Sequence, residues 1–172
     1  MLFRSDDIAT ALTARIKAVK LRPSLRGYQQ IQNLAGDAWQ TLKPDLLQHL
    51  RTMDNWSHAE AIVQIFLHEG SIDDAIATVT DTYARPNLIQ VVMDAAIAYK
   101  PEWVIATATR PAEEIMNRGK AESYQEAVNW LTKARTAYLQ SERQNEWQEY
   151  RAQLVITHGR KRKLMGLINQ QL

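Results

Sequence analysis

The sequence contains no cysteine and little glycine or proline. Without cysteine the chain cannot form a disulfide framework, a thiolate zinc site, an iron–sulfur cluster or a cysteine nucleophile. Six glycines and five prolines in 172 residues are about half the usual share of roughly 12%. So few turn-forming residues disfavour β-sandwiches and barrels. Because the sequence also shows no signal-peptide segment and no apolar run near the roughly 18 residues of a membrane span, we expect a cytoplasmic protein without membrane contact.

Charge of either sign is unevenly distributed, although the formal net charge is only +2. Residues 1–50 contain seven Lys/Arg and four Asp/Glu, and residues 111–172 contain ten and seven. Residues 51–110, in contrast, contain four Lys/Arg and eight Asp/Glu. An acidic middle between two basic ends argues against one continuous nucleic-acid-binding face.

Apolar residues recur at helical spacing along most of the chain. The longest such pattern covers residues 121–140 and is apolar on two faces, which predicts a helix covered from both sides. Proline fits the first turn of a helix and interrupts a helix interior. Pro44 is therefore expected to begin a short helix, and Pro111 is expected to kink or restart a helix near residues 107–110.

Three glycines predict where helices end, because glycine readily adopts the left-handed conformation at a helix C-terminus. Gly70, Gly119 and Gly159 each follow an apolar helical pattern, at irregular intervals near the ~34–47-residue periods of helical-hairpin repeats. The predicted fold is all-α, with antiparallel helical hairpins stacked as a tetratricopeptide-like α-solenoid. We expect a single domain over residues 1–172, with N-terminal helices in 1–53 and hairpin repeats in 54–172.

No motif of a known catalytic or cofactor site occurs in the sequence. Phosphate-binding loops, dinucleotide-binding glycine motifs and a serine nucleophile elbow are all absent. Three acidic pairs lie near expected helix starts, where the helix dipole favours them: Asp6-Asp7, Asp73-Asp74 and Glu113-Glu114. The histidines lack metal-ligand spacing: they are His49, His58, His68 and His158. We therefore expect no enzyme, no metal and no cofactor.

The residues with binding potential are four consecutive cations and two tryptophans. Arg160, Lys161, Arg162 and Lys163 are the densest charge run and suit phosphates or an acidic partner, or alternatively a solvated turn before the last helix. Cations at a helix start are unfavourable, which favours a functional role. Trp56 and Trp103 lie in expected first turns, where they act either as hydrophobic staples or as groove anchors.

About 60% of the chain, from residue 59 to residue 164, resembles the helical C-terminal region of bacterial SWIM zinc-finger family proteins. The resemblance implies a tetratricopeptide-like interaction region. The family's C-x-C…C-x-H zinc motif, implied to bind DNA or protein, has no counterpart because cysteine is absent. The chain is therefore either the tail of a longer protein or a relative that lost the finger. The resembling residues are Ala59, Glu69-Gly70, Ala75, Ile115-Met116, Gly119-Lys120, Ala127-Val128, Trp130-Leu131, Ala134-Arg135, Ala137-Tyr138-Leu139, Trp147, Tyr150, Leu154, His158-Gly159-Arg160-Lys161 and Leu164.

The function that the sequence favours is a non-catalytic helical-repeat scaffold for protein–protein interaction. Its partner would be a protein or peptide held in a concave groove that is lined by one helix of each pair. The alternative is an accessory nucleic-acid-binding module that acts through the C-terminal basic cluster, Arg160 to Lys163. These two functions differ in their salt dependence, because phosphate binding weakens steeply as salt is added.

Overall fold

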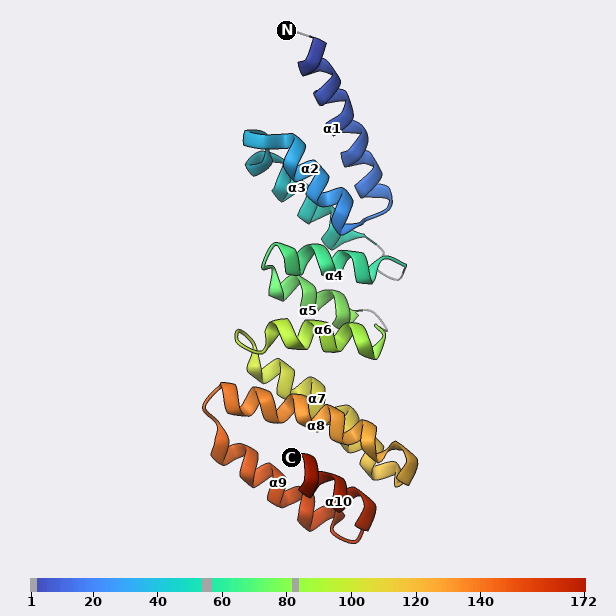
Figure 1. The fold of residues 1–172 in the computed structure, drawn as a ribbon, viewed down its shortest axis with the longest axis vertical. Coiled ribbons are helices and arrows are strands. Elements are labelled where there is room, and N and C mark those ends of the chain that lie inside the picture. The colour runs from blue at the N-terminus through green and yellow to red at the C-terminus, as the bar shows by residue number, and fades with distance from the viewer. Residues whose placement is uncertain (1–2, 54–56, 82–83) are drawn as a thin grey trace. The chain divides into compact units, whose positions relative to one another are not determined.

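A computed structural model of the chain describes residues 3–53, 57–81 and 84–172 (Figure 1). Helices account for 85% of the structure, and no strand occurs among the described residues. This share is far above the roughly 30–35% of an average soluble domain. The expected all-α class is therefore confirmed.

The chain is divided into two compact units, Met1–Val92 and Met93–Leu172. The boundary lies within helix α6 (Pro86–Ala96), whereas the sequence suggested a subdivision after residue 53. The single repeat domain over residues 1–172 stays a prediction.

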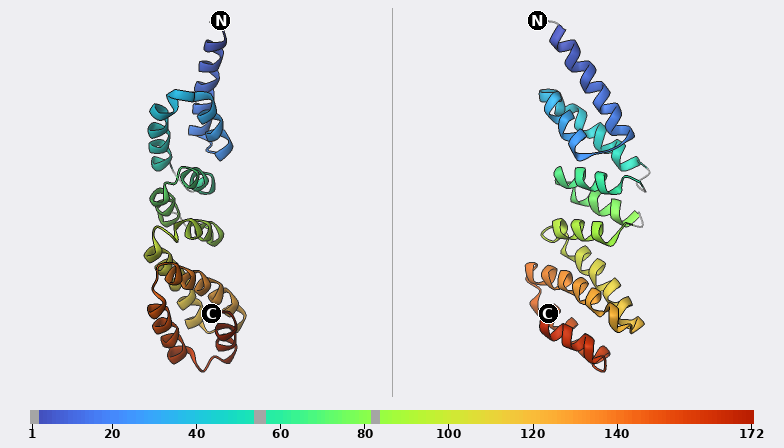
Figure 2. Two further views of the ribbon diagram at one scale, coloured as in Figure 1. Left: turned by 60° about the vertical axis from the view of Figure 1, so that its left-hand side comes forward. Right: turned by 45° about the vertical axis from the view of Figure 1, so that its right-hand side comes forward.

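The first unit is built from pairs of helices joined by short connections. Helices α1 and α2 form one pair, and α4 and α5 form a second, while α3 packs against α1 and α2. In both views of Figure 2 the N-terminal half of α1 extends past the other helices of this unit, and residues 7–11 are exposed. The helices are α1 (Phe3–Leu21), α2 (Leu25–Ala35), α3 (Trp39–Thr52), α4 (Ala59–His68) and α5 (Ile72–Asp81).

Pro44 lies inside α3 instead of beginning it, which corrects the sequence expectation. A 3-10 turn over Gly36–Ala38 leads directly into α3, so the helix starts earlier, at Trp39. The Trp39 ring packs edge-on against the fully buried Tyr28, with 5.1 Å between ring centroids. Burial of a large aromatic side chain contributes about 1.5–3 kcal/mol, which offsets much of the roughly 3 kcal/mol cost of an interior proline.

In the second unit α8 is the central helix, because α7, α9 and α10 all pack against it. The expected burial of residues 121–140 on two faces is confirmed: Tyr124, Val128, Leu131 and Tyr138 are buried, and so is Trp130. Five alanines of these two helices are fully buried and let α7 and α8 pack closely: Ala108, Ala112, Ala127, Ala134 and Ala137. The helices are α7 (Pro101–Arg118), α8 (Tyr124–Gln140), α9 (Gln144–His158) and α10 (Arg162–Gln171), with a 3-10 turn at Ala121–Ser123.

Helix α7 is continuous through Pro111, so the expected restart near residues 107–110 is wrong. Proline at position 111 removes the backbone hydrogen bond to the carbonyl of Thr107. Apolar residues on both sides of the proline are buried, including Ala108 before it and Ala112 after it. Because α8 covers this face of α7, packing outweighs the lost hydrogen bond.

The expected helix ends are found at Gly70, Gly119 and Gly159, but for two different physical reasons. Gly119 has a left-handed φ of 73°, and its N–H donates to the Met116 carbonyl. Gly159 instead has an ordinary φ of −53°. A Cβ atom at Gly159 would lie 2.7 Å from the Val155 carbonyl oxygen, which is too close for any side chain. Glycine is therefore required here because it has no Cβ atom.

Two glycine-to-alanine substitutions should change stability in opposite directions. Gly119→Ala places a side chain at a positive φ and should lower the free energy of unfolding by about 1 kcal/mol. Gly166→Ala lies inside α10 with open space around its Cβ position, and should raise it by about 0.5–1 kcal/mol. Urea denaturation of both variants measures the difference. Equal effects would mean that backbone conformation at Gly119 is not what ends α7.

Candidate functional site

An open cleft of about 460 Å³ lies in the second unit, between α8, α9 and the C-terminal end of α10. Five of its lining residues are spaced so that they share one face of α9. Arg135 and Leu139 lie one turn apart on α8. The complete lining is Arg135, Leu139, Gln144, Trp147, Gln148, Arg151, Ala152 and Leu172.

Trp147 gives the cleft a fixed aromatic wall. Its side chain is 4% exposed and packs with Tyr138 and Tyr150, at ring-centroid distances of 5.9 and 6.0 Å. Tyr150 in turn donates a hydrogen bond of 2.9 Å from its hydroxyl to Glu113 on α7. Burial raises the pKa of the Tyr150 hydroxyl well above its ordinary value, and the hydrogen bond and negative charge of Glu113 add to this effect. The phenol therefore stays protonated and holds α9 to α7.

Each of the two arginines in the cleft has a hydrogen-bond donor without an acceptor. The Nε atoms of Arg135 and Arg151 are buried and have no hydrogen-bond partner. Arg151 uses one terminal nitrogen, which donates to Asn169 Oδ1 at 3.0 Å. No ion pair of either arginine is found within residues 3–53, 57–81 and 84–172, and no Asp or Glu lines the cleft. A buried donor without an acceptor costs about 1–3 kcal/mol.

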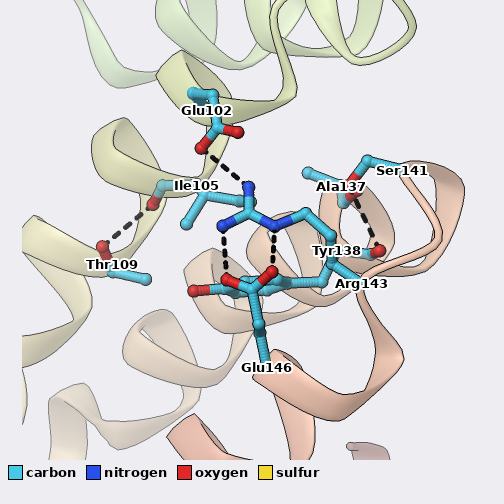
Figure 3. Close-up of polar contacts among 8 residues, drawn as sticks. All are labelled: Glu102, Ile105, Thr109, Ala137, Tyr138, Ser141, Arg143 and Glu146. Carbon is cyan, nitrogen blue, oxygen red and sulfur yellow. Dashed lines mark hydrogen bonds and ion pairs between the residues drawn. The ribbon is translucent and has the colours of Figure 1, made fainter.

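In contrast to Arg135 and Arg151, Arg143 at the turn between α8 and α9 has carboxylate partners for its guanidinium group (Figure 3). Its Nε and Nη2 donate to the two Glu146 oxygens at 2.6 and 2.5 Å, and its Nη1 donates to Glu102 at 2.7 Å. The guanidinium lies 5.3 Å from the centre of the Tyr138 ring. The hydrogen bonds to Glu146 and Glu102 raise the pKa of Arg143. Arg143 therefore connects the start of α9 to α7, and its guanidinium group is already occupied by these two carboxylates.

Of the four consecutive cations predicted as a binding cluster, Lys161 makes contacts within the chain. Lys161 donates to the Met116 carbonyl at the end of α7 at 2.6 Å, and its Nζ lies 2.9 Å from His158 Nδ1. The Met116 carbonyl accepts from both Gly119 N–H and Lys161, and a positive charge at a helix C-terminus interacts favourably with the helix dipole. Lys161 is thus a structural residue, whereas Arg160, Arg162 and Lys163 are exposed.

Of the two tryptophans proposed as anchors, the structure describes Trp103. Trp103 is half-buried in the first turn of α7, as expected, and it is not among the lining residues. Trp56 lies outside the described residues. The sequence reasoning missed Arg135, Arg151 and the glutamines of the cleft. The signal that could have found them is the one-face spacing of residues 144, 147, 148, 151 and 152, which combines a buried tryptophan with polar side chains.

A second, smaller cleft of about 220 Å³ lies in the first unit beside the turn between α1 and α2. It too has arginines and no acidic residue in its lining. The Arg15 guanidinium donates to Gln30 Oε1, and Ser24 accepts a hydrogen bond of 3.1 Å from the Gly27 N–H. The lining residues are Arg15, Ala18, Val19, Arg22, Ser24, Arg26, Gly27 and Gln30.

His158, beside Lys161, should make stability depend on pH. Burial and, to a smaller degree, the Lys161 charge lower the pKa of His158 below its ordinary 6.5, against an opposing effect of Glu113. The unfolded chain therefore takes up a proton more readily than the folded one, so stability is lost as the pH falls below about 6.5. Urea midpoints between about pH 7.5 and about pH 5.5 should fall less in His158→Gln than in the wild type. Identical slopes for the two proteins would contradict the assignment.

Comparison with protein-family models, curated proteins and solved structures finds no match to this chain. Within the part of the chain that the structure describes, no group of three or more His, Cys, Asp or Glu side chains is placed to hold a metal ion. Among the same residues, no helix has the length and apolar character that crossing a membrane requires.

Proposed function

We propose that this protein is a non-catalytic helical-repeat scaffold for protein–protein interaction. The observation that supports this proposal is that each unit carries an open cleft between packed helices, lined by arginines and without an acidic side chain. Such clefts present hydrogen-bond donors and positive charge on a rigid helical frame. A polypeptide offers the backbone carbonyls and acidic side chains that these donors require.

A non-catalytic role is supported by the lining of the larger cleft. It contains arginine, glutamine, leucine, alanine and tryptophan, but no Asp, Glu, His, Ser or Lys. General acid–base or nucleophilic catalysis needs at least one such group near the substrate. The cleft is therefore suited to hold a ligand and not to transform it.

We further propose that the helix pairs follow a tetratricopeptide-like α-solenoid arrangement and that the chain is related to the helical tail of SWIM zinc-finger proteins. The paired packing of α1 with α2, α4 with α5 and α7 with α8 supports the repeat arrangement. The burial of α8 on two faces also supports it, because an inner helix of a helical array is covered on both sides. Arg135, Trp147 and Arg151 all lie within the resembling stretch.

Selection of random twelve-residue peptides displayed on phage against the full-length chain tests the scaffold function. A binding scaffold should enrich one or more peptide families whose members compete with one another for the protein. A parallel titration with single-stranded and duplex DNA and RNA serves as the comparison. No enriched family, together with tight oligonucleotide binding, would contradict the proposal.

The alternative, a nucleic-acid-binding module, rests on the three exposed cations Arg160, Arg162 and Lys163. Each can neutralise a phosphate, so binding should show a log–log salt slope of roughly −2 to −3. The triple variant R160Q/R162Q/K163Q should flatten this slope, and it leaves the structural Lys161 in place. Absence of oligonucleotide binding at low salt would eliminate this alternative.

A further inference from the structure

The larger cleft contains two arginines and no acidic side chain that could pair with them. Arg135 and Arg151 come from different helices, and both keep a buried Nε without an acceptor. Arg143, between the same two helices, is paired with two carboxylates, Glu146 of α9 and Glu102 of α7. Acidic side chains therefore accept the hydrogen bonds of Arg143. The lining of the cleft contains no acidic side chain that could do the same for Arg135 and Arg151. The guanidinium charges of Arg135 and Arg151 are therefore not neutralised by any side chain of the cleft lining.

The charge of the lining selects an anion. The cleft contains two permanent positive charges and no negative side chain, and Gln144 and Gln148 add neutral amide donors. A guanidinium offers donors in a fixed planar fork that fits the two oxygens of a carboxylate. Hydrogen bonds of this charge-assisted kind are roughly twice as strong as neutral ones.

The apolar part of the lining favours a carboxylate on a peptide over a phosphate on a nucleic acid. Leu139, Ala152 and the side of Trp147 lie beside the arginines. An acidic residue followed by an aliphatic one would use both parts of this surface, whereas a phosphodiester backbone is charged along its whole length. The cleft lining does not include the exposed cations Arg160, Arg162 and Lys163. The cleft therefore lacks the continuous row of positive charges that would bind a nucleic-acid strand. A volume of about 460 Å³ lies within the usual range of ligand pockets, about 300–1,000 Å³.

We propose that the cleft between α8, α9 and the end of α10 is a binding site for an acidic–aliphatic peptide segment, with Arg135 and Arg151 holding a carboxylate between them. This inference rests on the proposed scaffold function and specifies what one of its clefts recognises. Trp147 and Leu139 contact the aliphatic neighbour of the acidic residue.

Fluorescence anisotropy with a labelled eight-residue peptide tests this site. The peptide carries two adjacent glutamates flanked by leucines, and its matched control has glutamine at both positions. The full-length protein carries any purification tag at its N-terminus, because Leu172 lines the cleft. We expect the glutamate peptide to bind at least about tenfold more tightly than the glutamine peptide, since charge-assisted hydrogen bonds provide most of the difference.

Variants of the protein locate the binding. R135Q/R151Q should weaken binding of the glutamate peptide at least about tenfold. R110Q/R118Q removes the same charge from exposed arginines of α7, both paired with Glu114, and should leave the affinity nearly unchanged. R135K/R151K retains the charge without the planar fork and should bind with intermediate affinity. Circular dichroism confirms that each variant keeps its helical content.

Several results would overturn the proposal. Equal losses in R135Q/R151Q and R110Q/R118Q would show general electrostatic attraction, and equal binding of both peptides would show that no carboxylate is recognised. Competition by inorganic phosphate or an oligonucleotide at lower concentrations than the free glutamate peptide would identify a phosphate site. If phage-selected peptides bind wild type and R135Q/R151Q equally, the scaffold function stands and the carboxylate site alone is wrong.

Discussion

Replacing Lys43 with methionine should lower the free energy of unfolding of the first unit by about 3 kcal/mol. Lys43 on α3 forms an ion pair with Glu69 at the end of α4, and the Glu69 side chain is only 7% exposed. The fully buried Tyr28 lies near this carboxylate, and burial together with the Glu69 charge raises the pKa of the Tyr28 hydroxyl. Without Lys43 the Glu69 carboxylate would be buried next to an aromatic ring with no opposite charge. Urea denaturation measures the loss.

Two further variants separate charge burial from lost packing. Removing the Glu69 charge as well, in K43M/E69Q, should recover part of the stability lost in K43M, because no uncompensated charge then remains in the core. Lys20→Met removes the partner of Asp45, whose side chain is 72% exposed, and should have little effect because solvent screens that pair. A K43M/E69Q variant less stable than K43M would contradict the electrostatic explanation.

Replacing Leu164 with alanine should cost about 3 kcal/mol and release α10 from the second unit. Leu164 is fully buried, and α10 packs mainly against α8 and less against α9. A helix of 10 residues is marginal in water without such packing. Because Leu172 at the end of α10 lines the larger cleft, the same substitution should also weaken peptide binding.

Hydrogen exchange distinguishes release of α10 from general destabilisation. Amide protons of α10 should lose protection in Leu164→Ala before those of α8 do. The matched control is Leu167→Ala in the same helix, which truncates a half-buried side chain and should cost less. Uniform loss of protection over α7 to α10 would mean that α10 does not open as a separate element.

The helical class and the central position of α8 could be predicted from the sequence, because both depend on local apolar periodicity. The stretch 121–140 repeats apolar residues on two faces, and the structure buries both. The ends of α7 and α9 could also be predicted, from Gly119 and Gly159. In these cases the residues that determine the element lie within it or directly after it.

The effects of Pro44 and Pro111 could not be predicted, because they depend on packing between helices distant in sequence. Burial of Trp39 against Tyr28 and of α7 against α8 outweighs the local cost of each proline. Propensity alone therefore gives the wrong helix boundary at residue 44 and a helix restart near residues 107–110 that does not occur.

The candidate site was missed for a related reason. Charge density along the sequence drew attention to Arg160–Lys163, but the structure uses Lys161 to cap α7, 45 positions back along the chain. Arg135 and Arg151 are 16 positions apart in the sequence and meet at one cleft only through the packing of α9 on α8. What makes them candidates is the absence of an acid beside them, which no linear pattern displays.

The most direct test of partner binding at this cleft observes the arginine side chains themselves. In ¹⁵N–¹H correlation spectra, buried arginine Nε–H groups give resolved signals, and titration with the glutamate–leucine peptide should shift those of Arg135 and Arg151. The Arg143 signal should stay in place, because Glu146 and Glu102 already occupy its guanidinium. Unchanged Arg135 and Arg151 signals at saturating peptide, or shifts confined to Arg160 and Arg162, would contradict the account.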